Sequence, residues 1–359
     1  MKLTEILNIC LTNNLAFYSY RLPYSNQIVT GIQLSQKIIS FVGFENQQMG
    51  FAIMPFDSNS TAKPLFIQSD ISFIDDNIDN SQLEKLLSIH YDTVPTGSST
   101  LETSKEEYLF QANSFINQLK NKELIKVVLS RAINSNLHIK ADASYLFDKL
   151  TKTYPHAFVS IFNVPGDSCW IGATPETLLK SNAEGIQTMS LAGTKSLNTL
   201  DEWTDKEREE QQMVSDFVEN VLQKFSFSEI EKDGPYEQNA GNVCHLMTKY
   251  NCKGKLTASD CYKLVKKLHP TPAVCGIPRE KAYELIRKAE QHDREYYAGF
   301  IGPINADNCE LFVNLRCMKL TDEGVSFFVG GGLTAQSQSE LEWNETCMKL
   351  ETLSKVIDG

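Results

Sequence analysis

A predicted helix near the C-terminus carries acidic side chains on an inward face, and this constrains the fold more than any other feature. The glycine-rich segment Gly330–Leu333 predicts a turn, and we expect the helix to begin at Ser339. Glu342, Glu345 and Lys349 are spaced i, i+3 and i+7, so they share one face, and the same stripe continues into apolar residues. Because an unpaired carboxylate in a core is costly, the fold must bring positive charge to this face.

A second predicted helix repeats the pattern. It begins at a capping box that starts at Thr204, and its apolar stripe extends back to Glu210 and Glu207. Glu207 could serve only the cap, Glu210 could pair with Lys206 or Arg208, and inward glutamates can also pair with arginines across a core. Alternatively, the four carboxylates of the two helices meet around a cation. All-oxygen ligation would favour a hard ion, Mg²⁺ before Ca²⁺.

Length and composition are those of an ordinary soluble enzyme. The chain has 359 residues, 42% hydrophobic and 22% charged. A net charge of −11 argues against a nucleic-acid or anionic-membrane partner. We find no signal peptide in the first residues and no run long enough for a membrane span. Nine scattered cysteines without a Cys-x-x-Cys pair indicate reduced thiols, so we expect a cytoplasmic protein without a zinc site.

The order of predicted elements indicates an α+β fold built on large antiparallel sheets. Helices interrupt strand-rich stretches without regular β-α-β alternation. We expect residues 1–100 to be a strand-rich N-terminal part of the same fold, and residues 101–359 to form the catalytic region. Asp92–Ser104, rich in Thr, Ser, Pro and Gly, is the best candidate for a linker or long loop. The predicted N-terminal strands are Gln27–Gln33, Ile38–Phe44 and Gly50–Phe56.

Several single residues allow both a structural and a chemical interpretation. Lys126 lies in a strand-like run, and spacing alone favours an edge-strand lysine that prevents aggregation over a catalytic lysine. Glu176 follows a proline and, on composition alone, is expected in an exposed turn. The small residues in Ser190–Lys195 could admit a ligand to the backbone or simply form a bulge. Arg316 is either a buried ion-pair partner or a fork for a carboxylate.

Eight segments, taken in order, resemble one family of enzymes. They are Lys126–Arg131, Gly172–Leu179, Leu191–Lys195, Lys206–Gln211, His269–Pro278, Arg294–Gly299, Asn314–Arg316 and Gly330–Leu350. In this order and spacing they resemble the chorismate-utilising enzymes, which include isochorismate synthases, salicylate synthases and the large subunits of anthranilate and aminodeoxychorismate synthases. The resemblance covers roughly residues 105 to 357. It implies a sandwich of large antiparallel β-sheets with helices outside, and a Mg²⁺-dependent attack on chorismate.

The resemblance gives the four inward carboxylates a common role. It implies that Glu210 and Glu345 bind Mg²⁺ directly and that Glu207 and Glu342 support it through waters. The metal would then hold the ring carboxylate of chorismate. The other carboxylate, on the enolpyruvyl group, would be bound by Arg316, Tyr297 and the backbone N–H groups of Gly330 and Gly332. Further pocket positions implied by the resemblance are Thr194, His245, Ala273 and Lys349.

The same resemblance assigns the acid and the base. Glu176 matches the general acid that protonates the departing C4 hydroxyl, and Lys126 matches the base that activates water for attack at C2. Hydroxide is a poor leaving group, so an acid is required, and a dry pocket would raise the pKa of a glutamate toward that task. A lysine that acts as a base must be uncharged, which desolvation favours.

Substitutions within the family favour one activity. Lys126 is typical of members that use water, whereas members that use ammonia carry glutamine there. Ala192 replaces the lysine that forms a covalent adduct in aminodeoxychorismate synthases, and Ala273 resembles isochorismate synthases. We therefore expect an isochorismate synthase that serves menaquinone or siderophore synthesis and works as a monomer without a glutaminase subunit. A salicylate synthase is the alternative. An amination enzyme or an inactive chorismate-binding relative is less favoured. The chain departs from the family pattern at Ser190, Gln211, Cys275 and Asn314.

Overall fold

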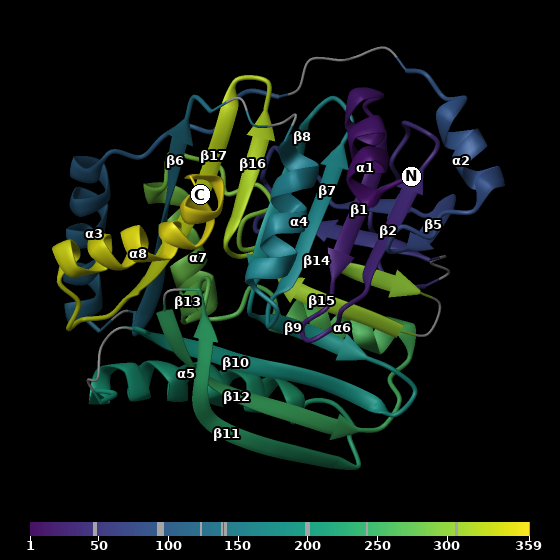
Figure 1. Ribbon diagram of the computed structural model, residues 1–359. Helices are drawn as coiled ribbons and strands as arrows, with labels where there is room; N and C mark the ends of the chain where they lie inside the picture. The colour runs from purple at the N-terminus through teal and green to yellow at the C-terminus, as the bar shows by residue number, and fades with distance from the viewer. Residues whose placement is uncertain are drawn as a thin grey trace.

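The chain folds into two large β-sheets that face each other, with helices on the outside (Figure 1). The structure, a computed structural model, describes residues 1–45, 49–91, 97–122, 124–137, 139, 142–197, 202–241, 243–305 and 308–358. Neighbouring strands pair antiparallel in both sheets. This arrangement confirms the α+β class and the sandwich of large antiparallel sheets with outer helices.

A nine-stranded sheet provides one wall of the predicted site. Its strand order is β13-β6-β17-β16-β8-β7-β1-β2-β5, so β6 and β17 lie side by side near one edge. The strands are β1 (Ala16–Arg21), β2 (Ile28–Gln33), β5 (Ile71–Ile74), β6 (Lys126–Ser135), β7 (Phe158–Val164), β8 (Ser168–Thr174), β13 (Gly276–Ile277), β16 (Cys317–Thr321) and β17 (Gly324–Leu333).

An eight-stranded sheet provides the opposite wall, in the order β11-β12-β10-β9-β15-β14-β3-β4. Strands from the first hundred residues occur in both sheets, so this region belongs to the same two-sheet architecture. Of the predicted loop Asp92–Ser104, residues 92–96 lie outside the described part of the chain. The strands are β3 (Gly50–Met54), β4 (Leu65–Gln68), β9 (Thr177–Ser181), β10 (Gly185–Ser196), β11 (Glu229–Ala240), β12 (Val243–Lys253), β14 (Phe300–Asn305) and β15 (Asn308–Val313).

The helices cover the outer faces of the two sheets (Figure 1). In the nine-stranded sheet, α4 packs on β7 and β8 and α8 packs on β17, while α5 and α6 pack on the eight-stranded sheet. The predicted capping box at Thr204 begins α5, and Ser104 caps α3 by accepting a hydrogen bond from the N–H of Glu107. The helices are α1 (Leu3–Thr12), α2 (Asn80–Leu87), α3 (Lys105–Lys120), α4 (Ala143–Thr153), α5 (Asp205–Leu222), α6 (Ala258–Leu268), α7 (Arg279–Ala289) and α8 (Ser339–Asp358).

A series of aromatic rings connects the inter-sheet core to the predicted site. Phe162 stacks on Trp170, Trp170 stacks on Phe328, and Phe328 stacks on Tyr297, with ring centroids 6.3, 5.3 and 5.6 Å apart. Stacked aromatic pairs add stability beyond the area they bury. Tyr297 is therefore held in place from the core side.

Two predictions about local structure were wrong. Ile38–Phe44 is not a strand; Ile39 makes only an isolated bridge, and the rings of Phe41 and Phe44 pack into an aromatic cluster. Their apolar character reflects tertiary packing and not strand alternation. The glycine-rich segment Gly330–Leu333 is not a turn, because β17 continues through it. Glycine has a low strand propensity, so sequence alone favoured a turn.

Candidate active site

Most of the predicted site residues line one cavity between the two sheets. The cavity is small, about 80 Å³, because charged side chains extend into it and pair with one another. Glu207 and Glu342 are the two predicted residues that do not line it. Those that do are Lys126, Glu176, Thr194, Glu210, His245, Ala273, Tyr297, Arg316, Gly330, Gly332, Glu345 and Lys349.

Lys126 is a buried residue that faces the cavity. Only 1% of it is exposed, and β6 is flanked on both sides, by β17 and β13. Its Nζ lies 2.6 Å from Oε1 of Glu210, which α5 brings from the opposite wall. The interpretation as a solvent-facing edge-strand lysine is therefore wrong, because the side chain points into the interior.

The inward face of α8 is neutralised by two further lysines. Nζ of Lys349 lies 2.6 Å from Oε1 of Glu345 and donates to the carbonyl oxygen of Gly330 at 3.0 Å. Nζ of Lys206, from the first turn of α5, lies 3.0 Å from Oε1 of Glu342. Lysines therefore supply the positive charge that the sequence predicted for this face of α8. The alternative prediction, that arginines pair with these glutamates, is wrong for this face.

The two α8 carboxylates influence each other. Burial raises the pKa of Glu342, the nearby Glu345 raises it further, and Lys206 only partly opposes this. Burial also acts to raise the pKa of Glu345, but Lys349, with help from Lys206, outweighs it and lowers that pKa. Two negative charges held this close favour any additional cation.

The alternatives for the α5 carboxylates are also resolved. Glu207 accepts hydrogen bonds from the backbone N–H and the side chain of Thr204, which confirms that it serves the cap. Glu210 pairs with Lys126, so the proposed local partners Lys206 and Arg208 are not its partners. A role for Glu207 toward a metal stays a prediction.

The glycines of β17 leave room for the site. A Cβ on Gly332 would lie 2.7 Å from Oε1 of Glu210 and 2.8 Å from Cε of Lys126, and a Cβ on Gly330 would lie 2.8 Å from the Tyr297 hydroxyl. Separations below 3.0 Å force a neighbour to move. A side chain at either position would displace the groups that are predicted to react or bind.

The same glycines direct polar backbone groups toward the site. Their partners on β6, Val128 and Ser130, donate their N–H groups to acceptors on the side away from β17. Alternate residues of an antiparallel pair face each other without exchanging hydrogen bonds. The N–H groups of Gly330 and Gly332 therefore point away from β6, as binding of a carboxylate would require.

Arg316 is a buried cation surrounded by neutral partners. It lies in the left-handed region at φ 48°, an uncommon conformation for a bulky residue that often accompanies function. Its guanidinium donates to Thr352 Oγ1 at 2.9 Å and to Nε2 of His245 at 3.2 Å. Burial lowers the pKa of Arg316 to about 10, so it stays charged at neutral pH. Within the described part of the chain no carboxylate forms an ion pair with it, which suits an anionic ligand.

His245 serves as a neutral partner of Arg316. Burial, followed by Arg316 and Lys349, lowers the pKa of His245 to about 3. Since Arg316 can only donate, Nε2 of His245 accepts, and Nδ1 carries the hydrogen that is donated to the carbonyl oxygen of Gly193 at 2.8 Å. Thr194 lies 3.3 Å from the same Nδ1. Gly193 sits in the irregular part of β10 at φ 71°, which confirms the predicted bulge.

Glu176 is a buried acid. It is 2% exposed, so its interpretation as an exposed turn residue is wrong. Burial raises the pKa of Glu176 to about 7, although Thr271 and Lys126 oppose the shift. Oε1 accepts a hydrogen bond from Thr271 at 3.3 Å. A carboxyl group with this pKa is substantially protonated near neutral pH and can donate a proton.

The oxygen atoms around Gly331 and Gly332 are of the kind that a hard divalent cation prefers as ligands. Carboxylate oxygens of Glu342 and Glu345 lie 3.8 and 3.9 Å from where a Cβ on Gly331 would be, and the Tyr108 hydroxyl lies at 3.7 Å. That hydroxyl is buried and lacks a hydrogen-bond partner. Across the described residues no group of three or more His, Cys, Asp or Glu side chains is arranged to hold a metal, because the carboxylates are paired with lysines. A cation would have to replace a lysine.

The comparisons with known proteins agree with this geometry. A model of the family described as "Chorismate binding enzyme" matches residues 65–358. The chain belongs to this family. It is 31% identical to the isochorismate synthase EntC of Escherichia coli K12 over 245 residues, which are 64% of this chain and 62% of that protein. It is 30% identical to the isochorismate synthase MenF of Bacillus subtilis over 270 residues, 72% of this chain and 57% of that protein. The chain thus spans about three fifths of the curated relatives it matches.

Solved structures of similar proteins share the fold. MenF of Escherichia coli, a menaquinone-specific isochorismate synthase, has a TM-score of 0.80 at 19% identity, covering 98% of this chain and 91% of that one. DhbC from Bacillus anthracis has a TM-score of 0.78 at 22% identity, covering 99% and 100%. Anthranilate synthase component I from Streptococcus pneumoniae has a TM-score of 0.67 at 17% identity, covering 94% and 90%.

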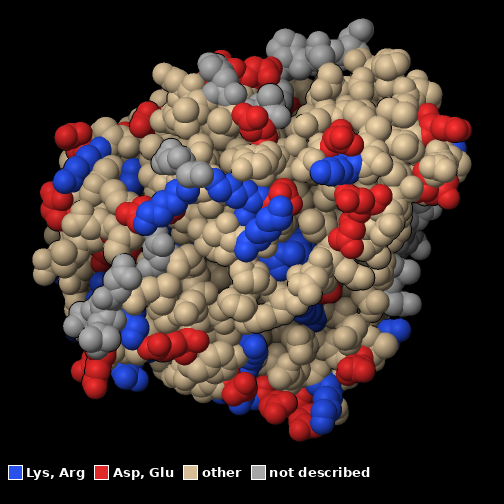
Figure 2. Space-filling view, viewed as in Figure 1, with Lys and Arg blue, Asp and Glu red and all other residues tan. Residues whose placement is uncertain are grey.

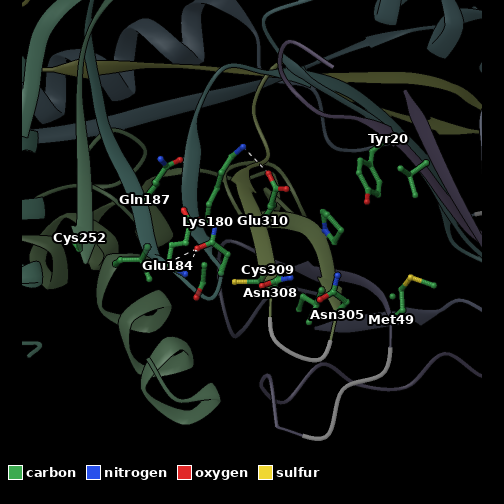
Figure 3. A pocket seen from close by; sticks show the side chains of 18 of the residues that line it. Tyr20, Met49, Lys180, Glu184, Gln187, Cys252, Asn305, Asn308, Cys309 and Glu310 are labelled. Carbon is green, nitrogen blue, oxygen red and sulfur yellow. Dashed lines mark hydrogen bonds and ion pairs between the residues drawn. The ribbon is translucent and has the colours of Figure 1, made fainter. Parts of the chain in front are cut away.

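Another cavity of this chorismate-binding family member lies apart from the predicted site. It has a volume of about 810 Å³ and is lined by none of the predicted site residues. Lys180 and Glu310, which face each other across neighbouring strands there, form an ion pair at 2.7 Å, with Gln187 in the same row and Tyr20 contributed by the other sheet (Figure 3). The charges of Lys180 and Glu310 therefore neutralise each other.

Surface charge is unevenly distributed. The net charge is −11, yet Figure 2 shows Lys and Arg side chains gathered near the middle of one face, with Asp and Glu mainly toward its edges. Local fields of one sign steer ligands of the other sign. An overall acidic chain can therefore still attract a small anion. None of the helices described is long and apolar enough to cross a membrane.

Two departures from the family pattern, Gln211 and Ser190, hydrogen-bond to each other. Gln211 is 2% exposed, and its amide donates to Ser190 Oγ at 3.0 Å and, at 3.3 to 3.4 Å, to Thr248 and Ser215. Ser190 and Ser215 are themselves 2.8 Å apart. The network ties α5 to β10 and β12 directly beneath Glu210. The other two departures are buried as well: Cys275 lies in the core, and Asn314 donates to the backbone of Tyr296.

We predict that Gln211→Ala lowers the free energy of unfolding by about 1–3 kcal/mol, because it removes the buried amide that donates to Ser190, Ser215 and Thr248 and leaves the Thr248 hydroxyl without this donor. Gln212→Ala is the matched control: the neighbouring amide is exposed and donates to Asp216, so a change within about 0.5 kcal/mol is expected. Urea denaturation of both variants measures the difference. Equal effects would show that the buried network contributes nothing.

Proposed function

We propose that this chain is a Mg²⁺-dependent isochorismate synthase that converts chorismate to isochorismate. The proposal is supported by the family membership and by the relatives named isochorismate synthase. The observation that carries it is a buried acid and a buried lysine, Glu176 and Lys126, lining one cavity. In the reaction, a water oxygen bonds to C2, the ring double bonds shift, and the C4–oxygen bond breaks, so that one water is consumed and one is released.

Glu176 is the proposed general acid. Its pKa is raised to about 7 by burial, so near neutral pH a large fraction carries the proton that the leaving hydroxyl needs. Positioned acids of this kind contribute about 10²- to 10⁴-fold to a rate. With its proton transferred, the C4 oxygen departs as water and not as hydroxide.

Lys126 is the proposed general base. It would take a proton from the attacking water, and for this its amine must be uncharged. Its Nζ now lies 2.6 Å from Glu210, which holds it as an ion pair. The base role therefore requires Glu210 to turn away from Lys126. Gly332 provides the space beside both groups in which such a rearrangement can occur.

Arg316, Tyr297 and the N–H groups of Gly330 and Gly332 are the proposed site for the enolpyruvyl carboxylate. Arg316 has neutral partners only, and a planar guanidinium matches a carboxylate with two donors. Lys349 adds positive charge from α8. The pocket is completed by Thr194, His245 and Ala273, which line the same cavity.

We propose Mg²⁺ at the carboxylate cluster. Glu210 and Glu345 would be direct ligands, with Glu342 and Glu207 supporting them. When bound, the ion would fix and neutralise the ring carboxylate of chorismate. Support comes from the all-carboxylate donor set and from the mutual repulsion of Glu342 and Glu345. We further propose that the enzyme works as a monomer without a glutaminase subunit, since Lys126 stands where ammonia-using relatives carry glutamine.

We predict that Glu176 loses its proton as pH rises through about 7, which is followed by the protonated-carboxyl band in the infrared difference spectrum between wild type and Glu176→Gln. Protonated Glu176 is the active form, and the fraction protonated drops about tenfold per pH unit above its pKa. Glu176→Gln should remove this dependence along with most of the turnover while keeping chorismate binding. Absence of this band below pH 7, or its persistence unchanged to pH 9, would contradict the assignment.

We predict that the purified chain converts chorismate to isochorismate only with Mg²⁺. EDTA should abolish turnover, and excess Mg²⁺ should restore it; NMR of the product mixture identifies what is formed. Salicylate with pyruvate would instead identify a salicylate synthase, and ammonia-dependent turnover would identify an amination enzyme. Undiminished turnover in EDTA would contradict the metal dependence. We propose that the product feeds menaquinone or siderophore synthesis, because a menaquinone-specific isochorismate synthase and a vibriobactin-specific one are both similar to this chain.

A further inference from the structure

One of the three lysines in the carboxylate cluster has no role in the proposed reaction. Lys126 and Lys349 both line the cavity, whereas Lys206 does not. Yet Lys206 reaches across from α5 to α8 and forms its ion pair with Glu342, a carboxylate that is only 3% exposed. The charges of Glu210 and Glu345 also act to raise the pKa of Lys206. Lys206 thus lies where several proposed metal ligands converge.

The position of Lys206 on its helix is not explained by helix stability. Thr204 caps α5 and Asp205 is its first residue, so Lys206 lies in the first turn. A positive charge there opposes the helix macrodipole, which favours acidic residues at this end. The lysine is therefore placed at some cost to the helix. The contact that offsets this cost is the ion pair with Glu342.

The side chain of Lys206 has space beside the carboxylate cluster into which it can move. The side chain is 30% exposed and also lines a neighbouring groove of about 320 Å³, with Leu119, Leu124 and Met213. Apolar side chains can accommodate the aliphatic stem of a lysine while its ammonium remains in water. Lys206 can thus leave Glu342 without losing all its packing, whereas Lys126, at 1% exposed, is enclosed.

We propose that Lys206 is an internal counter-ion that holds Glu342 in the metal-free protein and competes with the divalent cation for the carboxylate cluster. This inference rests on the proposed Mg²⁺ site. Without a cation, Lys206 keeps two mutually repelling carboxylates, Glu342 and Glu345, in place. When the divalent ion binds, the ammonium of Lys206 withdraws toward the groove. The affinity for the ion is therefore lower than the carboxylates alone would give.

The test is calorimetric titration of MgCl₂ into the chain without chorismate, comparing wild type, Lys206→Met and Lys105→Met. Lys105 is the matched control: it also pairs with a first-turn glutamate of α8, Glu340 at 2.9 Å, but both side chains are largely exposed. We expect Lys206→Met to bind Mg²⁺ at least about tenfold more tightly, equivalent to about 1.4 kcal/mol. Lys105→Met should bind like wild type.

Thermal unfolding in EDTA gives a second readout. Lys206→Met should melt at a lower temperature than wild type in EDTA, because Glu342 is then a buried carboxylate without its cationic partner, and saturating Mg²⁺ should recover more of the loss than it adds to wild type. If Lys206→Met does not fold, Lys206→Gln, which can still hydrogen-bond to Glu342 without a charge, is titrated in its place. Tighter binding by this variant is again the expected result.

The outcomes separate the two proposals. If wild type binds Mg²⁺ and loss of Lys206 leaves the affinity unchanged or weaker, the counter-ion role is wrong and the metal site stands. If Lys105→Met tightens Mg²⁺ binding equally, the tighter binding comes from the loss of any one positive charge and not from Lys206 in particular. The inference is then also overturned. If neither wild type nor the Lys206 variants bind Mg²⁺, the proposed metal site fails and the inference fails with it.

Discussion

The structure depends on three buried or partly buried lysine–glutamate ion pairs at the predicted site. An unpaired buried charge costs several kcal/mol, so a fold that turns Glu210, Glu342 and Glu345 inward must supply cations to them. Lys126–Glu210 joins β6 to α5, and Lys206–Glu342 joins α5 to α8. The third pair, Lys349–Glu345, lies within α8, and its lysine also donates to the carbonyl oxygen of Gly330 in β17. The same pairs explain why the cavity is small, and why binding a dianionic substrate with a divalent cation requires the pairs to exchange partners.

Much of the fold follows from sequence patterns, and the exceptions have physical causes. The capping box at Thr204 and the apolar stripe that follows it correctly predicted α5, since helix caps and helical spacing are local features of the sequence. Ile38–Phe44 has strand-like composition but packs as an aromatic cluster, which only the tertiary structure decides. The glycines of β17 resemble a turn in sequence. They are glycines because Tyr297, Lys126 and Glu210 occupy the space a side chain would take.

For the site, residue patterns and the family resemblance contributed different information. Helical spacing alone turned Glu342 and Glu345 inward, and their burial or partial burial agrees with this. Spacing alone gave the wrong environment for Lys126 and Glu176, because one lysine in a strand or one glutamate after a proline carries no signal of burial. The resemblance selected both residues. Neither the residue patterns nor the family resemblance predicted the pairing of Lys206 with Glu342, since it joins residues 136 positions apart on two helices.

The central claim is that Lys126 changes from the partner of Glu210 into the base of the reaction. Its most direct test is Lys126→Ala, with Lys120→Ala on the exposed side of α3 as control. Chorismate binding is measured by calorimetry with Mg²⁺, and turnover by following the product. The account predicts that Lys126→Ala binds chorismate within a few fold of the control but loses about 10²- to 10⁴-fold in turnover. Turnover equal to that of the control would contradict it.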